Sequence, residues 1–258
     1  MYRDTQCKLQ AHRGVCTEAP ENTMAAFRLA VAQDYDIIEF DPKFTKDNVC
    51  VVLHDRTLNR TVRVGGRELG EEKIYIADKL YAEVKMMDVG SWFSPEFARE
   101  RMPLLSDVLT YARKAEIESK IDNVVQTFTP EQIEIVFSTV EKCGGRVGLT
   151  CSDLSLLQTF AKRFPKAPLH YDGEVTSEAL DTLASFCEGH ETTVWMRLAD
   201  NPRTAWNKMP PATPELAALV RERFALGIWI LATDEEMERA LALHADVVET
   251  TGGIKPAK

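Results

Sequence analysis

The sequence predicts a closed (β/α)8 TIM barrel that occupies residues 1–258 as a single domain. Short apolar runs alternate with amphipathic segments of about 10–15 residues, which is the pattern of a parallel sheet with helical crossovers. Counting the extended runs that lead into helices indicates seven or eight such strand–helix units. A chain of 258 residues has the usual length of a closed barrel, which favours that fold over an open doubly wound sheet.

The chain opens with a predicted strand at Lys8–His12, followed by a helix from about Thr23 to Gln33 with Asn22 or Thr23 as its N-cap. The further strands are expected at Ile37–Asp41, Val49–His54, Ile117–Ile121, Arg146–Thr150, Ala167–Tyr171, Thr193–Leu198, Leu226–Leu231 and Asp246–Glu249. The further helices are expected at Leu105–Lys114, Pro130–Lys142, Asp153–Arg163, Ser177–Cys187, Thr213–Phe224 and Asp234–His244.

One stretch interrupts this alternation. Residues 56–102 combine Gly65-Gly66, Gly70 and Gly90 with mixed charges and several aromatic residues, and no clear periodicity runs through them. We expect a small insertion after the second barrel unit, on the loop face of the barrel, and no second domain.

Composition excludes several classes of partner. Lys and Arg number 31 and Asp and Glu number 40, so the net charge of −9 argues against a broad nucleic-acid-binding face. No apolar run reaches the ~18 residues of a membrane span, so no stable membrane insertion is expected. The N-terminus has no apolar signal core, and the six scattered cysteines form no CxxC pair, which together predict a cytoplasmic protein with reduced thiols. The sequence leaves the oligomeric state open.

Two of the predicted central strands contain charged residues. Side chains two positions apart in a strand share a face, so Glu39 lies with Asp41, and Glu118 lies with Lys120. Charges in a barrel core need partners. One interpretation is a structural ion-pair cluster. The other is a hard-cation site, in which three carboxylates bind Ca²⁺ or Mg²⁺ and Lys120 receives an anion beside the metal.

His12 and His54 each end a predicted strand. The carboxyl ends of parallel barrel strands form the catalytic mouth, and imidazole titrates near neutral pH, so two such groups can serve as general base and general acid. The alternative for each is a satisfied structural histidine. The remaining three histidines have no predicted cluster of carboxylates near them, and we expect them to be structural or surface residues: His170, His190 and His244.

The same residues belong to a series of short motifs that runs over residues 9–122. The series comprises His12-Arg13-Gly14, Ala19-Pro20-Glu21-Asn22-Thr23, Glu39-Phe40-Asp41, Phe44-Thr45-Lys46-Asp47, His54-Asp55-Arg56-Thr57-Leu58-Asn59-Arg60, Asp88-Val89-Gly90-Ser91-Trp92-Phe93, Met102-Pro103-Leu104-Leu105 and Glu118-Ser119-Lys120. In this order the motifs resemble the glycerophosphodiester phosphodiesterase family.

The resemblance implies a TIM barrel that hydrolyses small-molecule glycerophosphodiesters to sn-glycerol 3-phosphate and an alcohol, with one divalent cation, Ca²⁺ or Mg²⁺. The roles that it implies are His12 and His54 as the general acid/base pair, Glu39, Asp41 and Glu118 as metal ligands, and Arg13 and Lys120 as phosphate contacts. Glu21 is implied to orient its neighbours in the first loop, where Asn22 either reaches the site or only caps the helix.

The C-terminal half departs from the family pattern. Where members often carry Trp-Thr-Val-Asn on the seventh strand, this chain has Trp229-Ile230-Leu231-Ala232. Trp229 is expected to pack against the alcohol part of the substrate, whereas Ala232 cannot make the polar contact of an asparagine. The usual Thr-Asp near the end reads Glu249-Thr250-Thr251. These departures leave the choice of alcohol open.

Three other functions remain in competition. A lysophospholipase D or a cyclising phosphodiester lyase needs an apolar channel, for which the insertion offers residues that otherwise pack it onto the barrel: Tyr75, Tyr81, Met86, Met87, Trp92 and Phe93. A non-catalytic phosphate-ligand binding barrel is the second, although both histidines, the carboxylates and Lys120 are retained. A barrel whose charged strand ends are purely structural is the third.

Overall fold

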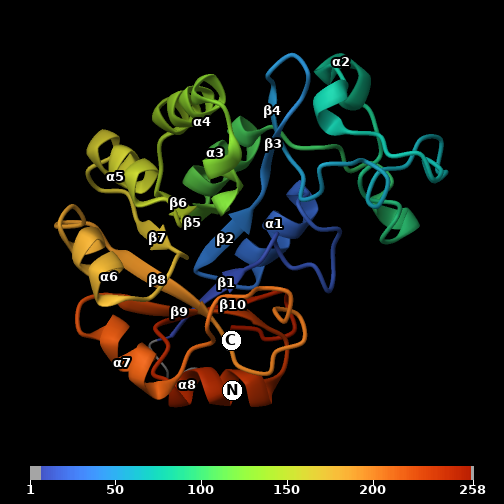
Figure 1. The fold of residues 1–258 in the computed structure, drawn as a ribbon. Coiled ribbons are helices and arrows are strands. Elements are labelled where there is room, and N and C mark those ends of the chain that lie inside the picture. Colours follow the sequence, from blue (N-terminus) through green and yellow to red (C-terminus); the bar gives the residue numbers. More distant parts are fainter. Residues whose placement is uncertain (1–6, 257–258) are drawn as a thin grey trace.

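The computed structural model describes residues 7–256 and confirms the predicted barrel (Figure 1). Eight parallel strands close in the order β1-β10-β9-β8-β7-β6-β5-β2. Their bounds are β1 Lys8–Ala11, β2 Ile37–Phe40, β5 Glu118–Ile121, β6 Val147–Cys151, β7 Leu169–Tyr171, β8 Thr192–Arg197, β9 Ala225–Leu231 and β10 Val247–Thr250.

Helices follow the barrel strands and cover the outside of the barrel (Figure 1). They are α1 Met24–Ala32, α3 Leu105–Lys114, α4 Pro130–Cys143, α5 Leu154–Arg163, α6 Ser177–Ala184, α7 Pro214–Arg221 and α8 Asp234–Ala242. Six of them begin after a residue whose side chain accepts a hydrogen bond from the first turn, namely Thr23, Thr129, Asp153, Thr176, Thr213 and Thr233. Such N-caps explain why the helices start where the sequence predicts. Within residues 7–256 no helix combines the length and apolarity needed to cross a bilayer.

The insertion begins earlier than the sequence predicts. The chain leaves the barrel directly after Asp41 and forms a two-stranded antiparallel sheet of β3 (Pro42–Phe44) and β4 (Cys50–Val52), then the short helix α2 (Tyr81–Val84). Single 3-10 turns lie at Ile76–Asp78 and Pro95–Phe97, and another follows β5 at Asn123–Thr127. Figure 1 shows α2 and its flanking loops to one side of the barrel.

The predicted strand Val49–His54 is therefore formed in part, but it is not a barrel strand. Its residues Val51 and Leu53 pack into a small separate core inside the insertion, together with Leu58, Val62 and Ile76. A buried strand has the same apolar pattern whether it joins the barrel or the small sheet of the insertion. The pattern reports that the strand is buried, and it does not report which strand it pairs with.

The alternation within the barrel strands separates two environments. In β2, Ile38 and Phe40 face outward into the main core, where the Phe40 ring lies edge-on to Phe27 of α1 at 5.9 Å between centroids. Glu39 and Lys120, which face each other in the β2–β5 register, lie on the opposite face inside the barrel. The inner face therefore carries the charged groups that the sequence pattern set apart.

Candidate active site

The first site residues sit on a tight turn at the carboxyl end of β1. The backbone N–H of His12 donates to Thr250 O at 2.9 Å, which extends the β1–β10 pairing by one residue. Arg13 and Gly14 then adopt positive φ angles of 58° and 82°. A Cβ on Gly14 would lie 2.6 Å from that of Ala26, so only glycine fits here. The turn aims Arg13 N–H at Glu39 Oε2, 2.9 Å away.

Three carboxyl groups gather at the same end of the barrel, and we call them the acidic group: Glu39, Asp41 and Asp122. Each offers one oxygen, and these oxygens all lie within 4.8 Å of one another. Because Phe40 pairs with Ile121, Asp41 and Asp122 follow their strands at the same level. Clustered carboxylate oxygens are the ligands that Ca²⁺ and Mg²⁺ prefer.

Two of the three carboxyl groups in the acidic group ionise less readily than a carboxyl group in water. Burial, together with Asp41, raises the pKa of Glu39 well above its ordinary value and that of Asp122 to about 7. Burial acts in the same direction on Asp41, but Arg13 and a hydrogen bond from Asn22 outweigh it and lower the pKa of that carboxyl. Asn22 Nδ2 donates to Asp41 Oδ2 at 2.8 Å. A divalent cation would replace the retained protons, so the donor set fits such an ion.

The structure does not bring Glu118 to the acidic group. Glu118 pairs with Ile37, one inward-facing position before Glu39 and about 7 Å lower along the strand direction. Its Oε2 accepts a hydrogen bond from Arg146 Nε at 2.7 Å, and its Oε1 lies 3.2 Å from His170 Nε2. Burial opposes ionisation of Glu118, but these two partners outweigh it and lower the pKa of the carboxyl. The geometry is that of a structural ion-pair cluster.

His170 has the structural role that the sequence analysis assigns to it. Its Nδ1 accepts a hydrogen bond from Trp195 Nε1 at 3.1 Å, so the ring proton lies on Nε2 and points to Glu118. Gly148 leaves room for the ring, since a Cβ there would be 2.6 Å from His170 Nε2. His190 and His244 lie outside the cavity described below.

Sequence reasoning missed Asp122, although a signal for it was present. Asp122 stands two positions after Lys120 and continues the inward-facing alternation by one step beyond the predicted strand. Both the expected strand and β5 end at Ile121, so Asp122 lies one residue beyond the stretch in which alternation predicts the facing of side chains.

The two predicted catalytic histidines line one cavity but come from different parts of the fold. His12 follows β1, and its buried Nδ1 has no hydrogen-bond partner among residues 7–256. Burial and the charge of Arg13 lower the pKa of His12 to about 3, so its imidazole is neutral at pH 7. His54 follows β4 in the insertion, and its Nδ1 lies 2.6 Å from Asp55 Oδ1.

An arginine-linked chain of charges connects the two histidine loops. Arg60 binds Asp55 through Nε and Nη2 at 2.7 and 3.0 Å, and binds both oxygens of Glu21 at 2.7 and 2.8 Å. Glu21 also accepts a hydrogen bond from Arg13 Nη1 at 3.1 Å. Burial opposes ionisation of Asp55, but hydrogen bonds from Arg60 and His54 outweigh it and lower its pKa to about 2. Asp55 and Arg60 fall inside a recognised motif, yet the sequence assigned them no role.

Lys120 lies in the same cavity in a paired state. Its Nζ donates to Glu249 Oε2 at 3.1 Å and lies 3.9 Å from the centroid of the Trp195 ring. Glu249 also accepts a hydrogen bond from Gln10 and lies 3.8 Å from His12 Nε2. The departure from the family pattern at Glu249 therefore places a carboxylate next to two predicted site residues.

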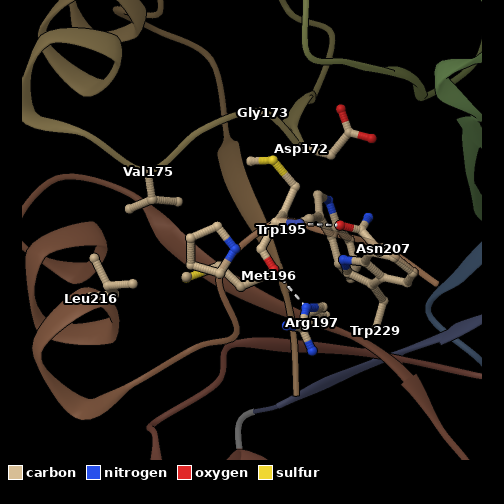
Figure 2. Close-up of a pocket in the computed structure, with 11 residues that line it drawn as sticks. Asp172, Gly173, Val175, Trp195, Met196, Arg197, Asn207, Leu216 and Trp229 are labelled. Atoms are coloured by element: carbon tan, nitrogen blue, oxygen red, sulfur yellow. Dashed lines mark hydrogen bonds between the residues drawn. The ribbon is translucent and has the colours of Figure 1, made fainter. Parts of the chain in front are cut away.

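A cavity of about 370 Å³ holds all of the predicted site residues except Glu118. Its lining comprises His12, Arg13, Glu39, Asp41, His54, Lys120, Asp122, Asn123, Thr150, Asp172, Trp195, Arg203, Trp206, Asn207, Trp229, Ile230 and Glu249. Figure 2 shows an adjoining side pocket of about 30 Å³, which shares Asp172, Trp195, Asn207 and Trp229 with the cavity. The Trp229 ring lies 6.0 Å from that of Trp206.

Comparisons with known proteins identify similar sequences and folds. The Glycerophosphoryl diester phosphodiesterase family matches residues 12–250. A glycerophosphodiester phosphodiesterase of Caldanaerobacter subterraneus is 41% identical over 98 residues, which is 38% of this chain and 37% of that protein. One from Bacillus altitudinis is 39% identical over 102 residues, 40% of this chain and 38% of that protein. The aligned segment thus spans less than half the length of these curated relatives.

A solved structure extends the likeness over nearly the whole chain. An Oleispira antarctica phosphodiesterase, solved in complex with the product sn-glycerol-3-phosphate, superposes with a TM-score of 0.74 over 95% of this chain and 93% of that one. The sequences are 17% identical, so this match shows a shared fold.

Proposed function

Because the chain belongs to the glycerophosphoryl diester phosphodiesterase family, we propose that it hydrolyses glycerophosphodiesters to sn-glycerol 3-phosphate and an alcohol. One observation carries the proposal: two histidines, an arginine, a lysine and three clustered carboxyl groups line a single cavity. The relatives named above carry the same activity in their names, and the Oleispira antarctica neighbour holds the corresponding product.

The acidic group would hold the single divalent cation, Ca²⁺ or Mg²⁺. We propose Asp122 as its third protein ligand in place of Glu118, because Glu118 is already bound by Arg146 and His170 one layer below. When bound, the ion would stabilise the negative charge that grows on the phosphoryl oxygens during the reaction.

Arg13 and Lys120 would bind the non-bridging oxygens of the phosphodiester. Arg13 Nε lies 3.4 Å from Asp41 Oδ2 and makes no hydrogen bond within residues 7–256. Lys120 uses one ammonium hydrogen on Glu249, which leaves others for a ligand. Both cations therefore have donors to spare for an anion that arrives beside the metal ligands.

The two histidines would move the protons. One histidine would accept a proton from the attacking oxygen, and the other would give a proton to the oxygen of the leaving alcohol. Asp55 Oδ1 lies 2.6 Å from His54 Nδ1 and orients the ring. The attacking oxygen belongs either to water or to the 2-hydroxyl of the glycerol moiety. In the second case the new bond forms a cyclic phosphate, which water then opens.

The cavity favours a small diester over a lysophospholipid. None of the six insertion residues that could form an acyl channel lines the cavity. Trp92 and Phe93 instead pack edge-on at 5.9 Å, and Phe93 packs against Phe97 at 5.7 Å. The insertion therefore supplies no acyl channel to this cavity.

The direct test is turnover of glycerophosphocholine with product identification. We expect sn-glycerol 3-phosphate and choline in Ca²⁺ or Mg²⁺ buffer, complete loss of activity after chelation, and recovery when either ion is restored. Lysophosphatidylcholine run in parallel should be a poor substrate. Full activity in metal-free buffer would contradict the cation, and no cleavage across a panel of glycerophosphodiesters would contradict the function.

Replacing Asp55 by asparagine should lower kcat by about 10–100-fold, the usual effect of losing a partner that orients a working histidine. KM should change little, because Asp55 is bonded to His54 and Arg60 and does not line the cavity. The matched control is Asp78→Asn at an exposed position of the insertion, which should leave kcat unchanged. A fall in thermal stability with kcat preserved would make Asp55 a purely structural residue.

A further inference from the structure

Polar side chains that the proposed mechanism does not use also line the active-site cavity. Thr150 lies on β6, Asp172 follows β7 directly, and Asn123 follows Asp122 of the acidic group. In the β6–β7 register Thr150 pairs with His170, so Asp172 lies two residues further along the neighbouring strand. These side chains therefore sit next to the acidic group, on the adjoining part of the barrel rim.

Two atoms of this set are buried without a partner. Thr150 is 3% exposed, and its Oγ1 makes no hydrogen bond within the described part of the chain. Asp172 Oδ1 is likewise buried and unpartnered, while its other oxygen accepts a hydrogen bond from Asn123 Nδ2. Native proteins leave few buried polar atoms unsatisfied because their desolvation is costly. Thr150 and Asp172 both belong to the lining of the cavity in which a substrate would bind.

The chemistry of the two atoms favours hydroxyl groups. A carboxylate oxygen accepts a hydrogen bond, and a threonine hydroxyl both donates and accepts. A hydroxyl group of a ligand satisfies either atom, whereas a quaternary ammonium group forms no such hydrogen bond with Thr150. Trp229 lines the same cavity and offers an apolar ring face for the carbon atoms of the ligand. Figure 2 shows the Asp172 carboxylate directed away from Val175 and Leu216 of the side pocket.

We propose that Thr150 and Asp172 form a hydroxyl-binding subsite that recognises the free hydroxyl groups of a glycerol unit on the substrate. This inference rests on the proposed function. It assumes that the phosphate of the same substrate binds Arg13, Lys120 and the cation that the acidic group would hold. Selectivity follows from the buried atoms: an analogue without the hydroxyl groups leaves both of them unpaired in the complex.

The test compares two ligands that differ only in hydroxyl groups. Binding of sn-glycerol 3-phosphate and of n-propyl phosphate to the Mg²⁺- or Ca²⁺-loaded protein is measured by calorimetry. We expect the wild-type protein to bind sn-glycerol 3-phosphate at least about 10-fold more tightly. Thr150→Val, which removes the hydroxyl at nearly constant volume, and Asp172→Ala should each reduce this preference to less than about 3-fold, whereas Thr150→Ser should retain it.

Thr61→Val is the matched control. Thr61 is also 3% exposed with an unpartnered Oγ1, but it lies in the insertion and not in the cavity lining. The ligand preference should be unchanged in this variant, so a general effect of deleting a buried hydroxyl would be recognised.

A second arm asks which glycerol unit is bound. If the unit is the one released, Thr150→Val should lower kcat/KM for glycerophosphoglycerol more than for glycerophosphocholine, with the preference in calorimetry unchanged. Unchanged selectivity in both arms would overturn the subsite, even if wild-type protein cleaves glycerophosphocholine. A protein that cleaves no glycerophosphodiester and binds neither phosphate would instead overturn the proposed function.

Discussion

Replacing His12 or His54 by alanine should each lower kcat on glycerophosphocholine by roughly 10²–10⁴-fold while the barrel remains folded. Each variant removes one of the two proton-transfer groups and leaves the acidic group, Arg13 and Lys120 in place. Within the described residues His12 Nδ1 has no hydrogen-bond partner, so the His12 variant breaks no hydrogen bond at that atom, and the His54 side chain is 40% exposed. Turnover with the purified variants measures the loss, and thermal melting verifies the fold.

The control for these variants is a histidine outside the cavity. His244 is exposed and adopts a positive φ of 58°, which asparagine tolerates well, so His244→Asn should keep full activity and stability. If His12→Ala or His54→Ala turns over at near the wild-type rate, that residue is not the acid or base. Loss of the melting transition together with activity would assign it a structural role instead.

The second large effect separates Asp122 from Glu118. Asp122→Asn should weaken Ca²⁺ or Mg²⁺ binding strongly and lower kcat/KM by at least about 100-fold, because it removes one of three clustered carboxylates. Glu118→Gln should leave metal affinity within a few-fold of wild type. It should instead destabilise the protein, since Arg146 and His170 lose the charged partner that they share.

Calorimetric metal titration and thermal melting of the two variants measure both effects. Each substitution exchanges one carboxyl group for the amide of equal size, so neither variant changes the volume of the side chain. The reverse pattern, with Glu118→Gln unable to bind metal and Asp122→Asn unaffected, would return Glu118 to the ligand set and require the β5 side chains to rearrange when the ion binds.

Local pattern was sufficient for most of the fold. Threonine and aspartate caps mark the starts of the helices, and alternation within Ile37–Asp41 correctly separates the outward Ile38 and Phe40 from the inward Glu39. The strand at Val49–His54 was assigned to the wrong sheet, because an apolar run states that a strand is buried but not which neighbour it pairs with.

The candidate site was predictable where residue type and position along a strand were enough. Both histidines, Arg13 and the Glu39–Asp41 pair lie together in one cavity, as their motifs indicate. Asp55 and Arg60 gained a role only from their contacts, since an ion pair that links two loops has no local signature.

By itself the sequence determined that this chain is a barrel with a charged inner face and with His12 at the end of its first strand, because side-chain alternation and chain order are local properties. Only the tertiary structure decided which carboxyl groups meet. Register between β2 and β5 places Asp122 level with Asp41 and leaves Glu118 one layer below, bound to Arg146 and His170. The reason is that the separation between side chains on different strands depends on how those strands align, and no single strand carries that information.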